Sequence, residues 1–121
     1  MPTRCPITVF GEVLFDCFPD GTEVLGGAPF NVAWHLRGFG LSSRLVSRVG
    51  RDARGERIRS AMGHWGLDVS ALQTDPIHAT GRVSVTLVNG EPCYAIVSGS
   101  AYDFIDPPEP SMVPGTGLLY H

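Results

Sequence analysis

Hydrophobic and polar residues follow two different periods along the chain, and each period predicts a type of element. The apolar run at residues 7–10 is typical of a strand buried in a parallel sheet. Apolar residues at helical spacing predict a first helix from Phe30 to the glycine stop signal at residues 38–40. A second helix is predicted at residues 53–65, with Asp52 as its N-cap and Gly66 as its stop.

Further segments predict strands. Residues 43–49, 72–74 and 118–120 are short alternating or apolar runs next to the two helices. Strand, helix, strand, helix and a final apolar run imply an α/β fold with a mostly parallel sheet and right-handed crossovers. A domain rarely ends inside a buried strand, because its backbone groups would be left unpaired, so we expect a truncated chain.

Two hairpins interrupt this pattern. Residues 80–88 alternate, with Val83, Val85 and Leu87 on one face, which is typical of a half-solvated antiparallel strand. The pair Asn89-Gly90 then predicts a type I′ turn, with residues 93–98 as the returning strand. Residues 12–25 predict the other hairpin, closed by a turn at Pro19-Asp20-Gly21.

Composition excludes several function classes. With 121 residues, of which 43% are hydrophobic and 17% charged, the chain is long and apolar enough for one globular core. A net charge of −3 gives no electrostatic footprint for nucleic acid, and no segment approaches the roughly 18 apolar residues that span a bilayer. The three cysteines lack metal-ligand spacing and indicate reduced thiols. We therefore expect a cytoplasmic protein with no nucleic-acid or membrane partner.

Candidate chemistry is concentrated in the loop before the first helix. Gly26 and Gly27 lack Cβ atoms, so the main chain there can adopt positive φ and approach a ligand closely. Asn31 falls in the first helical turn, beside free backbone N–H groups and the positive end of the helix dipole. Its amide can donate to one hydroxyl and accept from another, as binding a polyol requires. The alternative is a tight turn followed by an ordinary amphipathic helix.

The spacing of these residues resembles the first signature of the PfkB-type (ribokinase-like) sugar kinases. The matching positions are Gly26-Gly27, Pro29, Asn31, Ala33, Gly40 and Gly50. The flanks agree, with Gly11-Glu12 and Asp16 upstream and Gly50-x-Asp52-x-x-Gly55 downstream, and the Gly-Gly-Ala-Pro form is most similar to the fructokinase-like branch. The resemblance covers almost the whole chain but only the N-terminal part of such a kinase domain. It implies a ribokinase-like sheet flanked by helices, with a small antiparallel lid formed by hairpins near residues 12–25 and 80–98.

The resemblance also implies a function. Kinases of this family transfer the γ-phosphoryl group of ATP to a hydroxyl of a small sugar, and a fructose-like hexose is the first expectation. Asp16, Gly26, Gly27 and Asn31 would bind the acceptor sugar. Without the resemblance, Asp16 is equally well explained as a solvated strand residue. Tyr94 on the returning strand offers an aromatic face and a hydroxyl, with simple packing as the alternative.

The same family carries its catalytic base in a later Gly-Ala-Gly-Asp motif, which does not occur here. We therefore expect no catalytic or metal-binding residue in this chain, with ATP and Mg²⁺ bound mainly by residues beyond it. The fragment alone should be inactive. The alternative function is a non-catalytic sugar-binding module, or a module that forms a homodimer through the edge strands of the lid.

Overall fold

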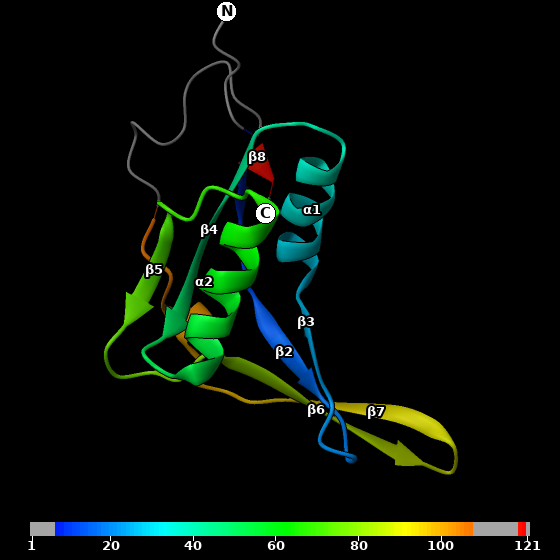
Figure 1. Cartoon of the computed structure of the whole chain (residues 1–121). Coiled ribbons are helices and arrows are strands. Elements are labelled where there is room, and N and C mark those ends of the chain that lie inside the picture. Colours follow the sequence, from blue (N-terminus) through cyan, green and yellow to red (C-terminus); the bar gives the residue numbers. More distant parts are fainter. Residues whose placement is uncertain (1–6, 108–118, 121) are drawn as a thin grey trace, which may run out of the picture.

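The computed structural model describes residues 7–107 and 119–120, which form two sheets and two α-helices (Figure 1). The first sheet is parallel, with the strand order β5-β4-β1-β8. Its strands are β1 (Ile7–Phe10), β4 (Ser43–Gly50), β5 (Leu72–Asp75) and β8 (Leu119–Tyr120). In register, Ile7 pairs with Ser43 and Ser47 pairs with Leu72. The predicted α/β class and parallel sheet are confirmed.

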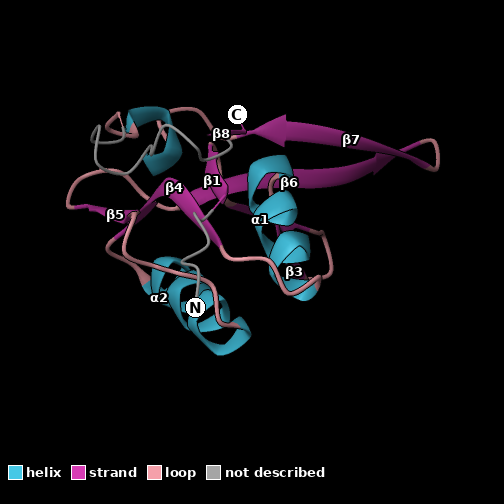
Figure 2. Cartoon of the chain, turned by 90° about the horizontal axis from the view of Figure 1, so that it is seen from above, coloured by secondary structure: helices cyan, strands magenta, loops and turns pink. Residues whose placement is uncertain are grey.

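The helices α1 (Ala28–Gly38) and α2 (Ala53–Trp65) connect β1 to β4 and β4 to β5, and both cover the same face of the sheet (Figure 2). Helix α1 starts two residues earlier than predicted, because Gly27 is its N-cap and Pro29 lies within its first turn. Helix α2 has the predicted bounds and caps. Asp52 accepts a hydrogen bond from the Gly55 N–H at 2.8 Å, and Gly66 ends the helix in the left-handed conformation at φ 88°.

A second sheet, which we call the lid sheet, has the order β3-β2-β6-β7 and projects from the end of the parallel sheet (Figure 1). One antiparallel hairpin consists of β2 (Leu14–Cys17) and β3 (Glu23–Gly26). The other consists of β6 (Gly81–Val88) and β7 (Glu91–Ile96), joined by the Asn89-Gly90 turn with both φ angles positive. Strand β6 also pairs in parallel with β2, from Leu14↔Gly81 to Cys17↔Ser84. The prediction of β6 as a purely antiparallel strand was therefore incomplete.

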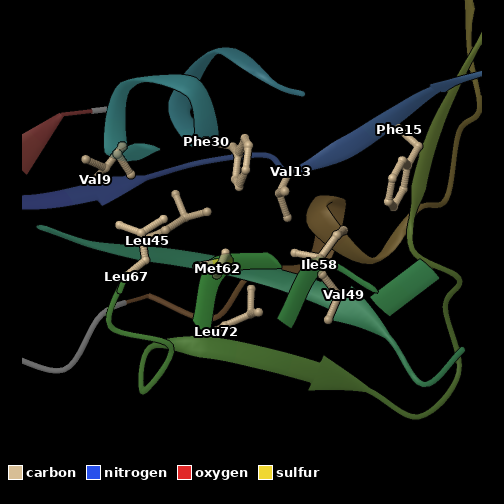
Figure 3. Packing of buried hydrophobic residues seen from close by; sticks show 11 residues of the cluster. Val9, Val13, Phe15, Phe30, Leu45, Val49, Ile58, Met62, Leu67 and Leu72 are labelled. Atoms are coloured by element: carbon tan, nitrogen blue, oxygen red, sulfur yellow. The ribbon is translucent and has the colours of Figure 1, made fainter. Parts of the chain in front are cut away.

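The core lies between the parallel sheet and the two helices, and Figure 3 shows how its side chains pack. Ile58 and Met62 of α2 are fully buried against strand residues such as Leu45, and Phe15 extends the core into the lid sheet. The helical spacing of Ile58, Met62 and Trp65 predicts that Trp65 belongs to the core, but it is 41% exposed. Its ring stacks on Trp34, with centroids 5.0 Å apart, and its Nε1 donates to the Trp34 carbonyl at 2.8 Å, so it closes the end of the helix pair instead.

Candidate functional site

The Gly-Gly loop owes its glycines to a close contact between two segments. Gly27 has φ 106°, and a Cβ there would lie 2.7 Å from the carbonyl oxygen of Glu12. Gly11 lies against the ring of Pro29, whose Cγ would be 2.5 Å from an added Cβ. The connection from β1 to β2 therefore rests directly on the first turn of α1. This contact requires the absence of a side chain at both glycines.

Asp16 lies in β2, between Val24 of β3 and Val83 of β6. It is half-buried, and its Oδ2 would be 3.5 Å from a Cβ added at Gly26. Within residues 7–107 and 119–120, its carboxylate forms no hydrogen bond or ion pair. The carboxylate is therefore held next to the Gly-Gly loop with its acceptor capacity unused by the described chain.

Asn31 is exposed on the first turn of α1. Its backbone N–H donates to the Gly27 carbonyl at 2.8 Å, so it closes the first helical bond and is not itself one of the free N–H groups. The amide side chain has no hydrogen-bond partner in the described part of the chain. Asp16, Gly26, Gly27 and Asn31 thus gather where the lid sheet meets the N-terminus of α1.

Tyr94 lies apart from these four residues. The register places it on the same face of the lid sheet as Asp16, because Asp16 pairs with Val83 and Tyr94 pairs with Val85. It stands two strand spacings across and two residues along the sheet from Asp16, roughly 12 Å away. There it lines an open groove of about 730 Å³ with apolar neighbours that include Phe18, Leu87 and Pro92. Leu87 shares the face of Val83 and Val85, as predicted, but its side chain is 68% exposed at this groove.

Sequence reasoning predicted Asp52 as a helix cap but missed its partner Thr80. Asp52 accepts from the Thr80 hydroxyl at 2.6 Å and from the Thr80 N–H at 2.9 Å. Burial alone would raise the pKa of Asp52, but the hydrogen bonds from Thr80 and Gly55 outweigh it and hold the pKa below its ordinary value. The Gly50 N–H donates to the Thr80 hydroxyl at 2.8 Å. This cluster fixes the start of β6, and a threonine before a strand carries no sequence signal for it.

The sequence alone predicts Asp75 as a cap or a surface group, and the surface alternative is wrong. It is 2% exposed and accepts backbone N–H bonds from His78 and Ile77, each 2.8 Å long. Arg48 Nε lies 2.9 Å and His78 Nδ1 3.0 Å from Oδ2. The backbone N–H of His78, followed by that of Ile77 and by Arg48, lowers the pKa of Asp75 far below its ordinary value. The cluster ties the connection from β5 to β6 onto β4.

Arg54, Arg57 and Arg59 lie opposite the apolar side of α2, which predicts a solvated face. Arg57 is exposed, as this predicts, whereas Arg54 is only partly exposed. Both donate to Glu23 of β3, from Arg54 Nη2 at 2.6 Å and from Arg57 Nη1 at 2.7 Å. The hydrogen bond from Arg54, and then that from Arg57, lowers the pKa of Glu23. Arg59 donates to the Leu72 carbonyl at 3.1 Å and to the Thr74 hydroxyl. The arginine side of α2 is therefore bonded to both sheets.

The part of the chain that the structure describes holds neither a metal-ligand cluster nor a membrane-spanning helix. No three of its His, Cys, Asp or Glu side chains gather to hold a metal ion. No helix within that part has the length and apolar character needed to cross a bilayer.

Comparison with known proteins gives the chain its family. The family model described as "pfkB family carbohydrate kinase" matches residues 12–109. A fructokinase of Klebsiella pneumoniae is 32% identical over 108 residues, covering 85% of this chain and 35% of that protein. A sugar kinase of Pyrococcus horikoshii, PH1459, has a structure in complex with ATP that matches with a TM-score of 0.73 and 28% identity, over 83% of this chain and 38% of that one.

The fructokinase of Vibrio cholerae in its apo form matches with a TM-score of 0.75 and 31% identity, over 89% of this chain and 39% of that one. The same enzyme has a structure with fructose, ADP and a calcium ion bound, at a TM-score of 0.69 and 26% identity, over 93% of this chain and 38% of that one. The chain thus spans well under half the length of the relatives that it matches. The ribokinase-like fold expected from the sequence is confirmed, and the chain belongs to the pfkB family of carbohydrate kinases.

Proposed function

We propose that this chain is the acceptor-sugar part of an ATP-dependent carbohydrate kinase that phosphorylates a hydroxyl of a fructose-like hexose. One observation carries the proposal. Asp16 and Asn31 present unpartnered polar side chains, within the described residues, at the same glycine loop. The relatives support it, since the Vibrio cholerae enzyme binds fructose and ADP and the Pyrococcus horikoshii kinase binds ATP.

Each of these residues makes a different kind of contact with the sugar in this proposal. The Asp16 carboxylate accepts hydrogen bonds from sugar hydroxyls, and the Asn31 amide both donates and accepts. Gly26 and Gly27 let the main chain approach the ring closely. Tyr94 belongs to the same face of the lid sheet and would contact only a ligand that extends towards the open groove.

ATP and Mg²⁺ belong to the proposed reaction of the whole kinase. The described residues offer no cluster that fits a metal ion, and the sequence has no Gly-Ala-Gly-Asp motif to supply a base. We place the ATP site, the Mg²⁺ contacts and the base in residues beyond this chain, so the chain on its own is catalytically inactive. A reactive sugar hydroxyl still needs a base and a neutralised phosphoryl group in line with it.

Calorimetric titration of the chain with fructose tests the acceptor site. Asp16→Ala and Asn31→Ala should each weaken fructose binding by about 1–3 kcal/mol, because a hydrogen-bond partner of the sugar is lost. Glu91→Ala is the matched control, since Glu91 is an exposed carboxylate of the same sheet with no partner among the described residues. Unchanged affinity in both site variants would place the sugar elsewhere, and titration with pentoses and nucleosides would show whether another acceptor fits better.

A homodimer formed through the lid sheet remains the second candidate function. It is favoured by the two edge strands β3 and β7 and by the exposed apolar residues that surround the groove. The non-catalytic module would need this surface and the sugar site but no phosphotransfer.

A further inference from the structure

The lid sheet is bonded to α2 by one carboxylate clamped between two arginines. Each oxygen of Glu23 has its own partner, Arg54 at 2.6 Å and Arg57 at 2.7 Å. The Glu23 side chain is 21% exposed, so the contact is largely shielded from solvent on the lid side. Hydrogen bonds between two charged groups are shorter and stronger than neutral ones, and burial reduces screening by salt.

Glu23 lies next to Asp16 in the lid sheet, but its side chain is on the opposite face. Glu23 pairs with Cys17, and the next pair along the hairpin is Val24 with Asp16. Because side chains alternate between the faces of a strand, Asp16 and Glu23 point to opposite sides of the lid sheet. The guanidinium of Arg57 also lies 4.5 Å from the centroid of Phe15, which shares the Glu23 face. Helix α2 therefore grips the lid sheet from behind the candidate sugar site.

The β2–β3 hairpin is held in three ways. Its inner end is held at the contact between the Gly26-Gly27 loop and the Glu12 backbone. Strand β2 is paired with β6 along its length, whereas β3 is an edge strand of the lid sheet. The contacts of Glu23, the first residue of β3, attach this edge strand to α2 and so restrict its freedom.

The same turn of α2 also anchors the other hairpin. Asp52, the N-cap of α2, binds the N–H and hydroxyl of Thr80 immediately before β6. Arg54, two residues later, binds Glu23. The start of α2 thus holds both halves of the lid sheet, and the two halves are joined by the parallel pairing of β2 with β6 (Figure 1).

We propose that Glu23 is a positioning residue, and that its contacts with Arg54 and Arg57 set the orientation of the lid sheet and thereby hold Asp16 in place over the glycine loop. We call these contacts of Glu23 with Arg54 and Arg57 the latch, and they are seen in the structure without any assumption about function. Only the effect of the latch on sugar binding rests on the proposed function. Losing the latch leaves the parallel sheet intact and loosens the β2–β3 hairpin.

Amide hydrogen exchange, followed residue by residue by NMR on the chain without sugar, tests the latch. In Glu23→Gln, which keeps the shape but removes the charge, amides of β2 and β3 should exchange about three- to tenfold faster, while those of β4 are unchanged. High salt should produce part of the same change in the wild type by screening the ion pairs. Glu91→Gln, on the same sheet, should leave every rate unchanged. Equal acceleration in β4, or no change in β2 and β3, overturns the proposal.

A double-mutant cycle and a sugar titration complete the test. Arg54→Gln combined with Glu23→Gln should loosen the hairpin no further than Glu23→Gln alone, because the Arg54 side chain reaches the hairpin through Glu23. If the wild type binds fructose, Glu23→Gln should weaken that binding about three- to tenfold, whereas unchanged affinity beside faster exchange overturns the positioning of Asp16. If the wild type binds no fructose, the proposed function fails and the latch is decided by the exchange rates.

Discussion

Glycine at position 27 reflects two separate demands, a positive φ and a close approach of backbone. Gly21, in the β2–β3 turn, has the first demand without the second, since φ is 89° and no atom lies within 4 Å of an added Cβ. At Gly27 the added Cβ would also meet the Glu12 carbonyl oxygen at 2.7 Å. Comparing substitutions at Gly21 and Gly27 therefore separates the cost of backbone strain from the cost of a steric clash.

Gly27→Ala should lower the free energy of unfolding by about 2–4 kcal/mol, because strain and overpacking add. Gly21→Ala should cost only about 1 kcal/mol, the penalty of left-handed backbone for a residue with Cβ. Urea unfolding monitored by tryptophan fluorescence measures both, with the Trp34–Trp65 stack as the probe. Equal losses in the two variants would mean that the contact with Glu12 contributes nothing.

At the level of single residues, the sequence predicted those whose role depends on local spacing. Asp52, Gly66 and the Asn89-Gly90 turn follow from cap and turn chemistry within a few residues, and all three are found. Thr80 and Glu23 acquire their partners from segments distant in the sequence, and Asp75 adds the distant Arg48 to its local partners Ile77 and His78. No local pattern marks the distant partners, so Asp75 was predicted only as a cap or surface group and Glu23 was not singled out.

At the level of elements, the buried Asp75 cluster joins three of them. It holds the connection from β5 to β6 against Arg48 of β4, and Arg48 also reaches Asp106 at 3.3 Å, beyond the 3₁₀ helix η1 (Ala101–Phe104). The ring of His78 stacks on Phe104 with centroids 3.7 Å apart. Both connections between the β6–β7 hairpin and the core therefore depend on one ionised carboxylate.

The pKa of Asp75 is lowered in the folded state, so its ionised form stabilises the fold. This contribution is complete above the ordinary aspartate pKa of 3.8 and is lost as the pH falls below that value towards the folded pKa. Asp75→Asn should therefore be less stable than the wild type at pH 5, and the difference should shrink at pH 3. Urea midpoints of both proteins across that range measure the difference. If the difference between the two urea midpoints stays constant from pH 5 to pH 3, the charge of Asp75 does not contribute to stability.

The elements themselves were largely predictable, and their pairing was only partly so. Periodicity located both helices and most strands of the parallel sheet, because a buried face repeats along each element. The parallel pairing of β2 with β6 joins strands more than sixty residues apart along the chain, and neither hairpin encodes it. The apolar alternation of β6 extends to Leu87 in sequence, but burial ends at Val85, where the strand passes beyond the core.

For the whole molecule, the family and fold were predictable because several signature residues lie at close backbone contacts of this fold. Gly11, Gly27 and Pro29 meet at one crossing of the chain, and Gly50, Asp52 and Gly55 meet at another. The candidate sugar site was predicted through its neighbours in that signature. Tyr94 lay outside any signature, and the structure places it in the open groove rather than beside Asp16.

The lid sheet also presents the surface on which the proposed homodimer depends. All six residues of the edge strand β7 are exposed, and Ile96 is 71% exposed on the same face as Tyr94. An edge strand beside exposed apolar side chains favours pairing with a second chain. We therefore expect the chain to sediment as a concentration-dependent monomer–dimer mixture in analytical ultracentrifugation.

Ile96→Asp should shift that mixture to the monomer, because the new carboxylate would lose its hydration inside the interface without gaining a partner. Phe39→Asp is the control, since Phe39 is 83% exposed and directly follows α1, whose C-terminal end lies away from the lid sheet (Figure 1). The control should sediment as the wild type does. A wild type that stays monomeric at every concentration would contradict the lid-mediated homodimer, as would two variants that dissociate equally. Either result would leave the acceptor-sugar site as the role of the lid face.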